Sequence, residues 1–241
     1  GGKGIRVADN EEELRTLAPQ AQAEAVAAFG DGGLYLERAV RSPRHIEVQI
    51  LGDGTDAIHC YERECSLQRR RQKVWEEAGA VCLDKETRET LCNSAVALAK
   101  SVNYCGAGTL EYLYDEATNE FFFIEMNTRI QVEHPISEMI TGVDLVQEMI
   151  RVCGGAKLSL TQDQIHRNGH AIEVRINAED PLMRFMPWPG KLEKMSVPRG
   201  EGIRFDHFLY EGYQIPTFYD SLLGKVIVHA PTRAEAITKL K

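Results

Sequence analysis

The alternation of polar and apolar residues from Glu125 to Glu133 constrains the fold more than any other feature of this sequence. Successive side chains of a β-strand point to opposite faces, so a strand over residues 121–132 gathers the polar side chains on one face. Alternation alone does not indicate a functional site, because a strand with one face in solvent shows the same pattern. The two faces consist of Glu125, Asn127, Arg129, Gln131 and Glu133 on one side, and of Met126, Ile130 and Val132 on the other.

A second carboxylate favours a functional site over a solvated face. Residues 106–113 read as the preceding strand, and a hairpin centred near Thr118 places Glu111 opposite Glu125. Their Cβ atoms then lie roughly 5 Å apart, where like charges are destabilising unless a cation neutralises them. Mg²⁺ binds one or two carboxylates together with substrate phosphates. With Asn127 beside Glu125, the spacing predicts a site for Mg²⁺ and a nucleotide.

Residues 63–73 carry five positive side chains and one negative one, in a chain whose net charge is −8. Such a run is commonly a solvated face or a nucleic-acid patch. A net acidic chain is nevertheless a poor candidate for broad nucleic-acid binding, which needs a basic face. Strand alternation of Arg69, Arg71 and Lys73 directs part of the run to one side. Beside a carboxylate–Mg²⁺ site, we interpret the run as a clamp for phosphate or bicarbonate.

Two further segments carry weaker signals. Gly1, Gly2 and Gly4 form a glycine-rich start whose backbone N–H groups are able to wrap phosphates, although such a run is as often a simple turn. Because the chain opens inside this loop, we expect it to be a fragment of a longer protein. A strand from Glu173 places Arg175 on the same face as Glu173 and Asn177, which alone is little evidence for catalysis.

The order of the expected elements indicates an α+β fold, because hairpins and separate helices are mixed along the chain. No apolar run is long enough to span a bilayer. The six cysteines include no Cys-x-x-Cys pair, which favours reduced intracellular thiols. We expect strands at 5–8, 34–37, 45–50, 57–61, 106–113, 121–132, 170–178, 191–197 and 225–229, and helices from Asn10 to Gly30, over 84–101, over 144–152 and from about Thr232.

The segment Glu125–Pro135 resembles the signature of biotin carboxylases, which belong to the ATP-grasp superfamily. The likeness runs from Gly1 to Lys241, and the sequence closely resembles the biotin carboxylase component of acetyl-CoA carboxylase, an enzyme of fatty acid biosynthesis. Related modules occur in propionyl-CoA, other acyl-CoA and pyruvate carboxylases. Further segments that carry the resemblance are Pro43–Glu47, Gln68–Arg70, Gln72–Lys73, Met139–Leu145 and Arg175–Pro181.

The resemblance implies a reaction in which ATP and bicarbonate form carboxyphosphate. Carboxyphosphate yields CO₂ and phosphate, the ureido nitrogen of biotin is deprotonated, and carboxybiotin results. The implied cofactors are ATP, Mg²⁺ or Mn²⁺, and biotin bound to a carrier. The implied partners are bicarbonate, a biotin carboxyl carrier protein or domain, a carboxyltransferase component and a second copy in a homodimer, with neither nucleic acid nor membrane. A cytoplasmic location is expected, or the mitochondrial matrix in a eukaryote.

The resemblance also assigns roles to individual positions. Glu133 is the base for bicarbonate, Arg129 binds that anion, Lys73 holds carboxyphosphate, and Arg175 stabilises the enolate of biotin. The metal is expected on Glu111 and Glu125, with Asn127 alongside. Nucleotide and substrate contacts are expected from the mobile loop with Gly1, Gly2 and Gly4, from the adenine hinge with Glu37, Arg38 and Val40, and from His45, Gln68, Leu113, Gln131 and Val132.

The implied fold is an ATP-grasp fold, with a mostly antiparallel sheet and flanking helices. Its expected parts are the remainder of a small ATP-lid subdomain over 1–39, the ATP-grasp core over 40–167, and a truncated C-terminal subdomain over 168–241. Departures from the family pattern are Arg38 in place of Lys, Arg71 in place of His, and Glu77–Val81 without the usual prolines.

Two other functions compete with this interpretation. One is an ATP-grasp ligase with a different acceptor. The other is a non-catalytic acidic module that binds an anionic partner through residues 63–73. Glu133 together with Arg129 and Arg175 favours the biotin carboxylase, because simple anion binding needs no base.

Overall fold

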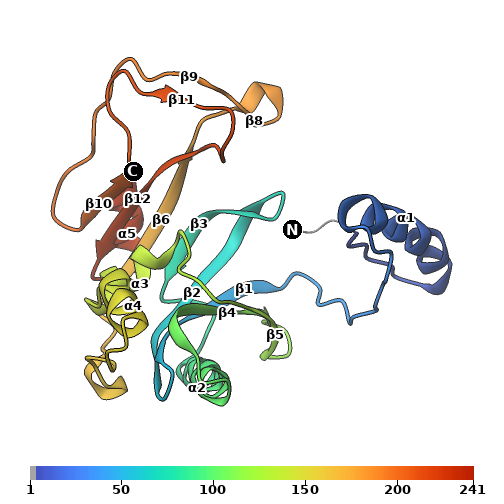
Figure 1. The fold of residues 1–241 in the computed structure, drawn as a ribbon, viewed down its shortest axis with the longest axis horizontal. Coiled ribbons are helices and arrows are strands. Elements are labelled where there is room, and N and C mark those ends of the chain that lie inside the picture. Colours follow the sequence, from blue (N-terminus) through green and yellow to red (C-terminus); the bar gives the residue numbers. More distant parts are fainter. Residues whose placement is uncertain (1–3) are drawn as a thin grey trace. The chain divides into compact units, whose positions relative to one another are not determined.

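The computed structural model describes residues 4–241, and the chain forms two compact units. The first comprises Gly1–Ser42 with Arg69–Gln72, and the second comprises Pro43–Gln68 with Lys73–Lys241. Figure 1 shows helix α1 (Glu11–Phe29) in the first unit and the large sheet in the second. None of the helices within residues 4–241 is long and apolar enough to cross a bilayer.

Helix α1 confirms the helix expected after Asn10. The Asn10 side chain accepts a hydrogen bond from the Glu13 N–H at 2.9 Å, and Gly30 ends the helix with a φ of 75°. Pro19 lies inside the helix without ending it. The strands expected at 5–8 and 34–37 are wrong, since both segments lie outside helix and strand. Neither finds a partner strand among residues 4–42, and an extended segment forms a ladder only with a partner.

The second unit is built on an eight-stranded sheet of order β10-β12-β6-β3-β2-β1-β4-β5. Every pair whose register is described is antiparallel, which confirms the expected α+β class with a mostly antiparallel sheet. The strands are β1 (Arg44–Asp53), β2 (Ala57–Arg69), β3 (Gln72–Ala78), β4 (Cys105–Asp115), β5 (Glu120–Asn127), β6 (His170–Asn177), β10 (Ile203–His207) and β12 (Leu222–Ala230).

Two small sheets lie outside the large one. Strand β7 (Glu179–Asp180) pairs with β8 (Met186–Pro187), and β9 (Gly190–Lys191) pairs with β11 (Gln214–Ile215). Of the strand expected at 191–197, only Lys191 belongs to a strand. The partner strand β11 has two residues and therefore pairs with two residues of β9. Short 3₁₀ turns occupy Gln162–Gln164 and Pro181–Met183.

Strand β1 is buried on both faces. Ile46, Val48 and Ile50 point to one face, where they join a core with helix α2 (Lys85–Ser101). Glu47 and Gln49 point to the other face and are also 0% exposed. The alternation of polar and apolar residues over 45–50 alone predicts a half-buried strand with Glu47 and Gln49 facing outward. This prediction is wrong, because a layer of polar partners covers both side chains. Helix α2 itself was expected, and Asp84 caps it by accepting from the Thr87 N–H.

Two helices cover parts of the polar face of the sheet. Helix α4 (Leu145–Cys153) packs Leu145 and Val152 against Leu51 and Ile58, and confirms the helix expected over 144–152. Helix α3 (His134–Thr141) was not predicted, and it packs against β6 and β12. On the opposite face of those two strands, α5 (Arg233–Leu240) buries Ala236 and begins after Thr232, as expected.

Candidate functional site

A row of charged side chains crosses four strands on the polar face of the sheet. In successive ladders Arg63 of β2 lies opposite Glu47 of β1, Glu47 lies opposite Glu111 of β4, and Glu111 lies opposite Glu125 of β5. The predicted pairing of Glu111 with Glu125 is therefore confirmed. The next row places Asn127 opposite Thr109 and Thr109 opposite Gln49.

The pairing of Glu111 with Glu125 depends on a β-bulge. Near the turn Asp115 pairs with Glu120, and this register continues to Tyr112 opposite Phe123. The register then shifts by one residue between Tyr112 and Glu111. Without this bulge Glu111 would face Ile124, and the two carboxylates would not share a position in the ladder.

Lys73 of β3 lies among three carboxylates on this face. Its Nζ lies 2.5 Å from Glu47 Oε2, 3.1 Å from Glu111 Oε1 and 2.6 Å from Glu133 Oε1. Burial lowers the pKa of Lys73, but the charges of Glu47 and the other carboxylates outweigh it and raise this pKa above its usual value. Lys73 is therefore a permanently charged ammonium at the centre of the site.

Arg63 is fully buried and uses all five of its N–H donors. Its Nε donates to Glu47 Oε1 at 2.6 Å, and the remaining donors reach four other side chains. This network ties Glu47 on β1 to α3 and to the loop before α3. The four other acceptors are Gln49 and Ser137, which bond to Nη1, and Thr109 and Gln131, which bond to Nη2.

Of the predicted clamp for phosphate or bicarbonate over residues 63–73, Arg63 is excluded because protein side chains use its donors, whereas the role of Lys73 stays a prediction. Arg63 and Lys73 are held by carboxylates inside the protein. The expected alternation from Arg69 to Lys73 is also wrong, because the chain turns between β2 and β3 at Arg70 and Arg71, whose φ values are 52° and 65°. Two consecutive residues with positive φ are typical of a tight hairpin turn.

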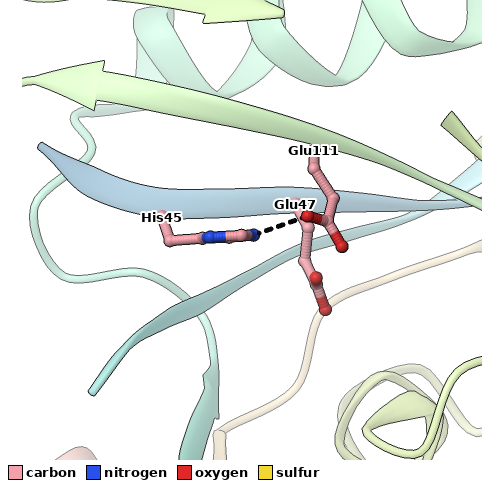
Figure 2. A group of neighbouring side chains, drawn as sticks. All are labelled: His45, Glu47 and Glu111. Carbon is pink, nitrogen blue, oxygen red and sulfur yellow. Dashed lines mark ion pairs between the residues drawn. The ribbon is translucent and has the colours of Figure 1, made fainter. Parts of the chain in front are cut away.

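His45, Glu47 and Glu111 converge on one point of the sheet, as Figure 2 shows. His45 Nε2 lies 3.0 Å from Glu111 Oε2, and its Nδ1 lies 3.1 Å from the side-chain nitrogen of Gln68. The structure thus brings the predicted nucleotide contacts His45 and Gln68 together beside the predicted metal ligand. Leu113, which is half-buried, lies opposite His45 in the ladder.

The carboxylates of Glu47 and Glu111 are held in their ionised form. Burial alone would raise the pKa of Glu47, but the charges of Arg63 and Lys73 outweigh it and lower this pKa to about 2. Burial likewise opposes ionisation of Glu111, whereas the contact with His45 and the charge of Lys73 lower its pKa to about 2. Both groups therefore stay negative at any physiological pH.

Glu111, Glu125 and Asn127 fit a divalent cation. The side-chain nitrogen of Asn127 lies 3.1 Å from Glu111 Oε1 and 3.5 Å from Glu125 Oε1, so both carboxylates reach one common point. Oxygen donors of this kind suit Mg²⁺, and the amide of Asn127 carries an oxygen as well as a nitrogen. A second group of potential ligands, Glu47, Cys65 and Glu133, fits a metal less well because burial raises the pKa of the Cys65 thiol.

The strand expected over 121–132 ends at Asn127, so Arg129, Gln131 and Glu133 do not continue its face. The chain leaves the sheet because α3 begins at His134, with Pro135 in its first turn. The loop nevertheless returns Gln131 to the site, where its side-chain nitrogen donates to Glu111 Oε1 at 3.0 Å. Glu133 also reaches the site, and its carboxylate makes no capping bond within the described chain.

Glu133 is held between two cations. Its Oε1 contacts Lys73, and its Oε2 accepts a hydrogen bond from Arg175 Nη2 at 3.0 Å. Arg175 lies on β6, so the carboxylate joins β3, β6 and the start of α3. Arg129 is exposed and does not share this contact, since its Nη2 donates to Asn127 Oδ1 at 3.3 Å.

Several predicted ligand contacts lie elsewhere. Glu37 and Arg38 are exposed and Val40 is half-buried, on a segment of the first unit that has neither helix nor strand. Gly4 also belongs to the first unit and has a φ of 79°, whereas Gly1 and Gly2 lie outside the described residues. The roles given to these positions stay predictions. Val132 is half-buried, and its carbonyl accepts a hydrogen bond from Lys225.

Sequence reasoning missed the part that Glu47 takes in this site. The alternation of His45, Glu47 and Gln49 resembles that of Glu125–Glu133, with polar groups of mixed chemistry on one face. That mixture was the available signal. A second missed group comprises Glu76, Glu173 and Lys225, whose neighbourhood only the order of strands β3, β6 and β12 brings about.

Comparison with known families divides the chain into two matched regions. Residues 1–161 match the carbamoyl-phosphate synthase L chain, ATP binding domain, and residues 173–241 match the biotin carboxylase C-terminal domain. A biotin carboxylase of Nostoc sp. is 52% identical over 242 residues, which cover 100% of this chain and 54% of that protein. The chain thus spans about half the length of the curated relatives that it matches.

Solved structures give the same likeness. The biotin carboxylase domain dimer of Hydrogenobacter thermophilus 2-oxoglutarate carboxylase, solved with MgADP, ADP and bicarbonate, has a TM-score of 0.92 at 49% identity and covers 100% of this chain and 53% of that one. A biotin carboxylase–β,γ-ATP complex from Campylobacter jejuni has a TM-score of 0.93 at 48% identity, with the same coverage.

Proposed function

The chain belongs to the biotin carboxylase family of the ATP-grasp superfamily, and we propose that it takes part in the ATP-dependent carboxylation of biotin by bicarbonate through carboxyphosphate. The observation that carries this proposal is the position of Glu133 between Lys73 and Arg175. Lys73 and Arg175 hold this carboxylate in place, where it is able to accept a proton from an anion bound beside them.

We propose the following roles for the residues around Glu133. The carboxylate of Glu133 accepts the proton of bicarbonate, and Arg129 binds that anion. Lys73 holds carboxyphosphate, for which its permanent charge is suited. Arg175 stabilises the negative charge that develops on the ureido oxygen of biotin, because its guanidinium lies within hydrogen-bond reach of the base.

Nucleotide and metal are proposed to lie along the row of carboxylates. Glu111 and Glu125, with Asn127, would hold Mg²⁺, or Mn²⁺ with its similar preference for oxygen, and the bound ion would neutralise charge on the transferring phosphoryl group. His45, Gln68, Leu113, Gln131 and Val132 are the proposed substrate contacts of the sheet. Gly1, Gly2, Gly4, Glu37, Arg38 and Val40 are the proposed contacts of the lid and hinge.

The proposal extends to the parts of the reaction outside this chain. Biotin would arrive on a carrier protein or domain, and a carboxyltransferase component would consume carboxybiotin. We propose a homodimer, a state in which the Hydrogenobacter relative was solved. Acetyl-CoA is the acceptor that we propose first, on the sequence resemblance, and transfer assays with acetyl-CoA, propionyl-CoA and pyruvate discriminate among the candidates.

The test is ATP hydrolysis by the full-length enzyme, with bicarbonate and biotin each withheld in turn. We expect ADP release to require bicarbonate and to rise with biotin. Glu133→Gln should lower the rate by about 10²–10⁴-fold, the usual contribution of a general base. The matched control is Glu120→Gln, which removes an exposed carboxylate from the β4–β5 hairpin and should retain the rate. Biotin-independent ADP release that survives Glu133→Gln would contradict the proposal and favour an ATP-grasp ligase with another acceptor.

A further inference from the structure

A cluster of four charged side chains, of which two are fully buried and two half-buried, lies on one face of β3, β6 and β12. Glu76 lies opposite Glu173, and Arg175 lies opposite Lys225, so each pair brings like charges together. Glu173 and Arg175 are two residues apart on β6 and therefore share this face. Like charges directly opposite each other destabilise a sheet unless other partners compensate them. The contacts of each group show how the cluster is balanced.

Glu76 makes a two-pronged contact with Arg175. Its Oε1 lies 2.7 Å from Arg175 Nε and 2.7 Å from Arg175 Nη2. The same Nη2 donates to Glu133 Oε2 at 3.0 Å. A continuous chain of contacts thus runs from the fully buried Glu76 through the guanidinium to the proposed base. The guanidinium cannot rotate without breaking its contacts with Glu76.

Glu173 contrasts with Glu76, although both are 0% exposed. Both carboxyl oxygens of Glu173 are buried and accept no hydrogen bond within residues 4–241. Lys225 donates instead to the carbonyl of Val132. A buried carboxyl group that lacks donors is more stable with its proton than without it.

The protonation preferences of the two carboxyl groups agree with these contacts. Burial raises the pKa of Glu173 well above its usual value, and the charge of Lys225 only partly opposes this. Burial also raises the pKa of Glu76, to about 7, and there the guanidinium of Arg175 is the main opposing influence. Of the two groups, Glu76 therefore ionises first. Above neutral pH the negative charge therefore lies on the carboxylate that contacts Arg175.

We propose that Glu76 is a positioning residue for biotin carboxylation, whose carboxylate fixes the guanidinium of Arg175 beside Glu133. The inference rests on the proposed function, because the role of Arg175 toward biotin does. An arginine side chain has four rotatable bonds, and the single contact with Glu133 would leave the guanidinium free to turn. Small errors in the position of a charge-stabilising group are costly to the rate.

The experiment compares Glu76→Gln with the matched variant Glu173→Gln in the full-length enzyme. The readout is the ratio of ADP release with biotin to ADP release with bicarbonate alone. Glu76→Gln should lower this ratio at least tenfold, through kcat and not through KM for ATP, because the role proposed for Arg175 is toward biotin and not toward ATP. Glu173→Gln should retain the ratio within twofold, since a neutral amide replaces a neutral acid. Glu76→Asp retains the charge and should recover part of the loss.

A double-mutant cycle with Arg175→Gln tests whether Glu76 acts through the guanidinium. If it does, Glu76→Gln combined with Arg175→Gln falls no further than Arg175→Gln alone. Independent, multiplicative losses would overturn the inference. A normal ratio in Glu76→Gln beside a lost ratio in Arg175→Gln would also overturn it, while the proposed function stands. A normal ratio in both Glu76→Gln and Arg175→Gln would overturn the inference about Glu76 together with the proposed function. Thermal unfolding of each variant identifies losses that misfolding causes. If Glu76→Gln fails to fold, the ratio of ADP release measured for Glu76→Asp decides.

Discussion

The two faces of β1 are equally buried and differ completely in chemistry. Ile46, Val48 and Ile50 point toward α2, whereas Glu47 and Gln49 point toward Arg63 and its partners. Burial of each aliphatic side chain stabilises the fold by roughly 1.5–3 kcal/mol. Burial of charge is costly. The attraction between opposite charges offsets that cost but adds little net free energy of folding. The apolar face therefore holds the sheet together, and the polar face is retained for its chemistry.

The comparison predicts its largest effect at Arg63. Replacing Arg63 with Leu leaves the buried carboxylate of Glu47 with Lys73 as its remaining cationic partner and removes the donor that bonds to Gln49. We expect a loss of about 3–5 kcal/mol in the free energy of unfolding, measured by urea denaturation. The double variant Arg63→Leu with Glu47→Leu should recover part of that loss. A loss below about 1 kcal/mol in Arg63→Leu would show that the polar face does not depend on this pairing.

The matching change on the apolar face is Ile50→Ala. It removes side-chain volume from the core under α2, and we expect a cost of about 2–5 kcal/mol in the free energy of unfolding. The charged row is untouched, so the remaining folded enzyme should show a normal KM for ATP and a normal response to biotin. Altered kinetics in the folded fraction would mean that the two faces are not separable.

The stability of the protein at acid pH should depend on the polar face of β1 and not on its apolar face. The pKa values of Glu47 and Glu111 lie at about 2, below the usual value of 4.5. A carboxyl group with a lowered pKa stabilises the fold above its unfolded pKa, and this contribution disappears as the pH falls through the folded pKa. These two groups should therefore contribute constant stability above pH 4.5 and lose it between about pH 4.5 and 2. Glu111→Gln should flatten this acid loss in denaturation curves, and an unchanged curve would contradict the assignment.

The last prediction concerns Glu173, whose pKa is raised, in contrast to the lowered pKa values of Glu47 and Glu111. The unfolded chain releases this proton at a lower pH than the folded chain, so stability falls as the pH rises above the unfolded value of 4.5. Glu173→Gln should make the free energy of unfolding less dependent on pH from about pH 4.5 upward. An unchanged slope would show that Glu173 is ionised in the folded protein.

The sequence predicted the parts of the site that depend on local spacing. Alternation and a turn near Thr118 predicted Glu111 opposite Glu125, although the ladder reaches this pairing only through a bulge that the alternation did not reveal. The polar residue Asn10 located the start of one helix, and the spacing of apolar residues located the helix over 84–101. The strand through Val132 failed because a helix start at His134 takes the chain out of the sheet. Alternation reports which residues share a face and does not report whether that face is covered.

The burial of Glu47 illustrates what local patterns do not contain. Its partners Arg63 and Lys73 come from two other strands, and Gln131 and Ser137 complete the network from beyond β5. Only the order of strands in the sheet brings these groups together. The same holds for Glu76 and Glu173, which are far apart in the sequence and adjacent between β3 and β6.

The most direct test of the account follows the carboxyl group itself. Radiolabelled bicarbonate is incubated with ATP, Mg²⁺, biotin and the full-length enzyme, and labelled carboxybiotin and ADP are counted together. We predict that labelled carboxybiotin forms together with ADP, that both fall by about 10²–10⁴-fold in Glu133→Gln, and that Glu120→Gln retains both. Release of ADP without labelled carboxybiotin, or labelled product at the normal rate from Glu133→Gln, would contradict the account.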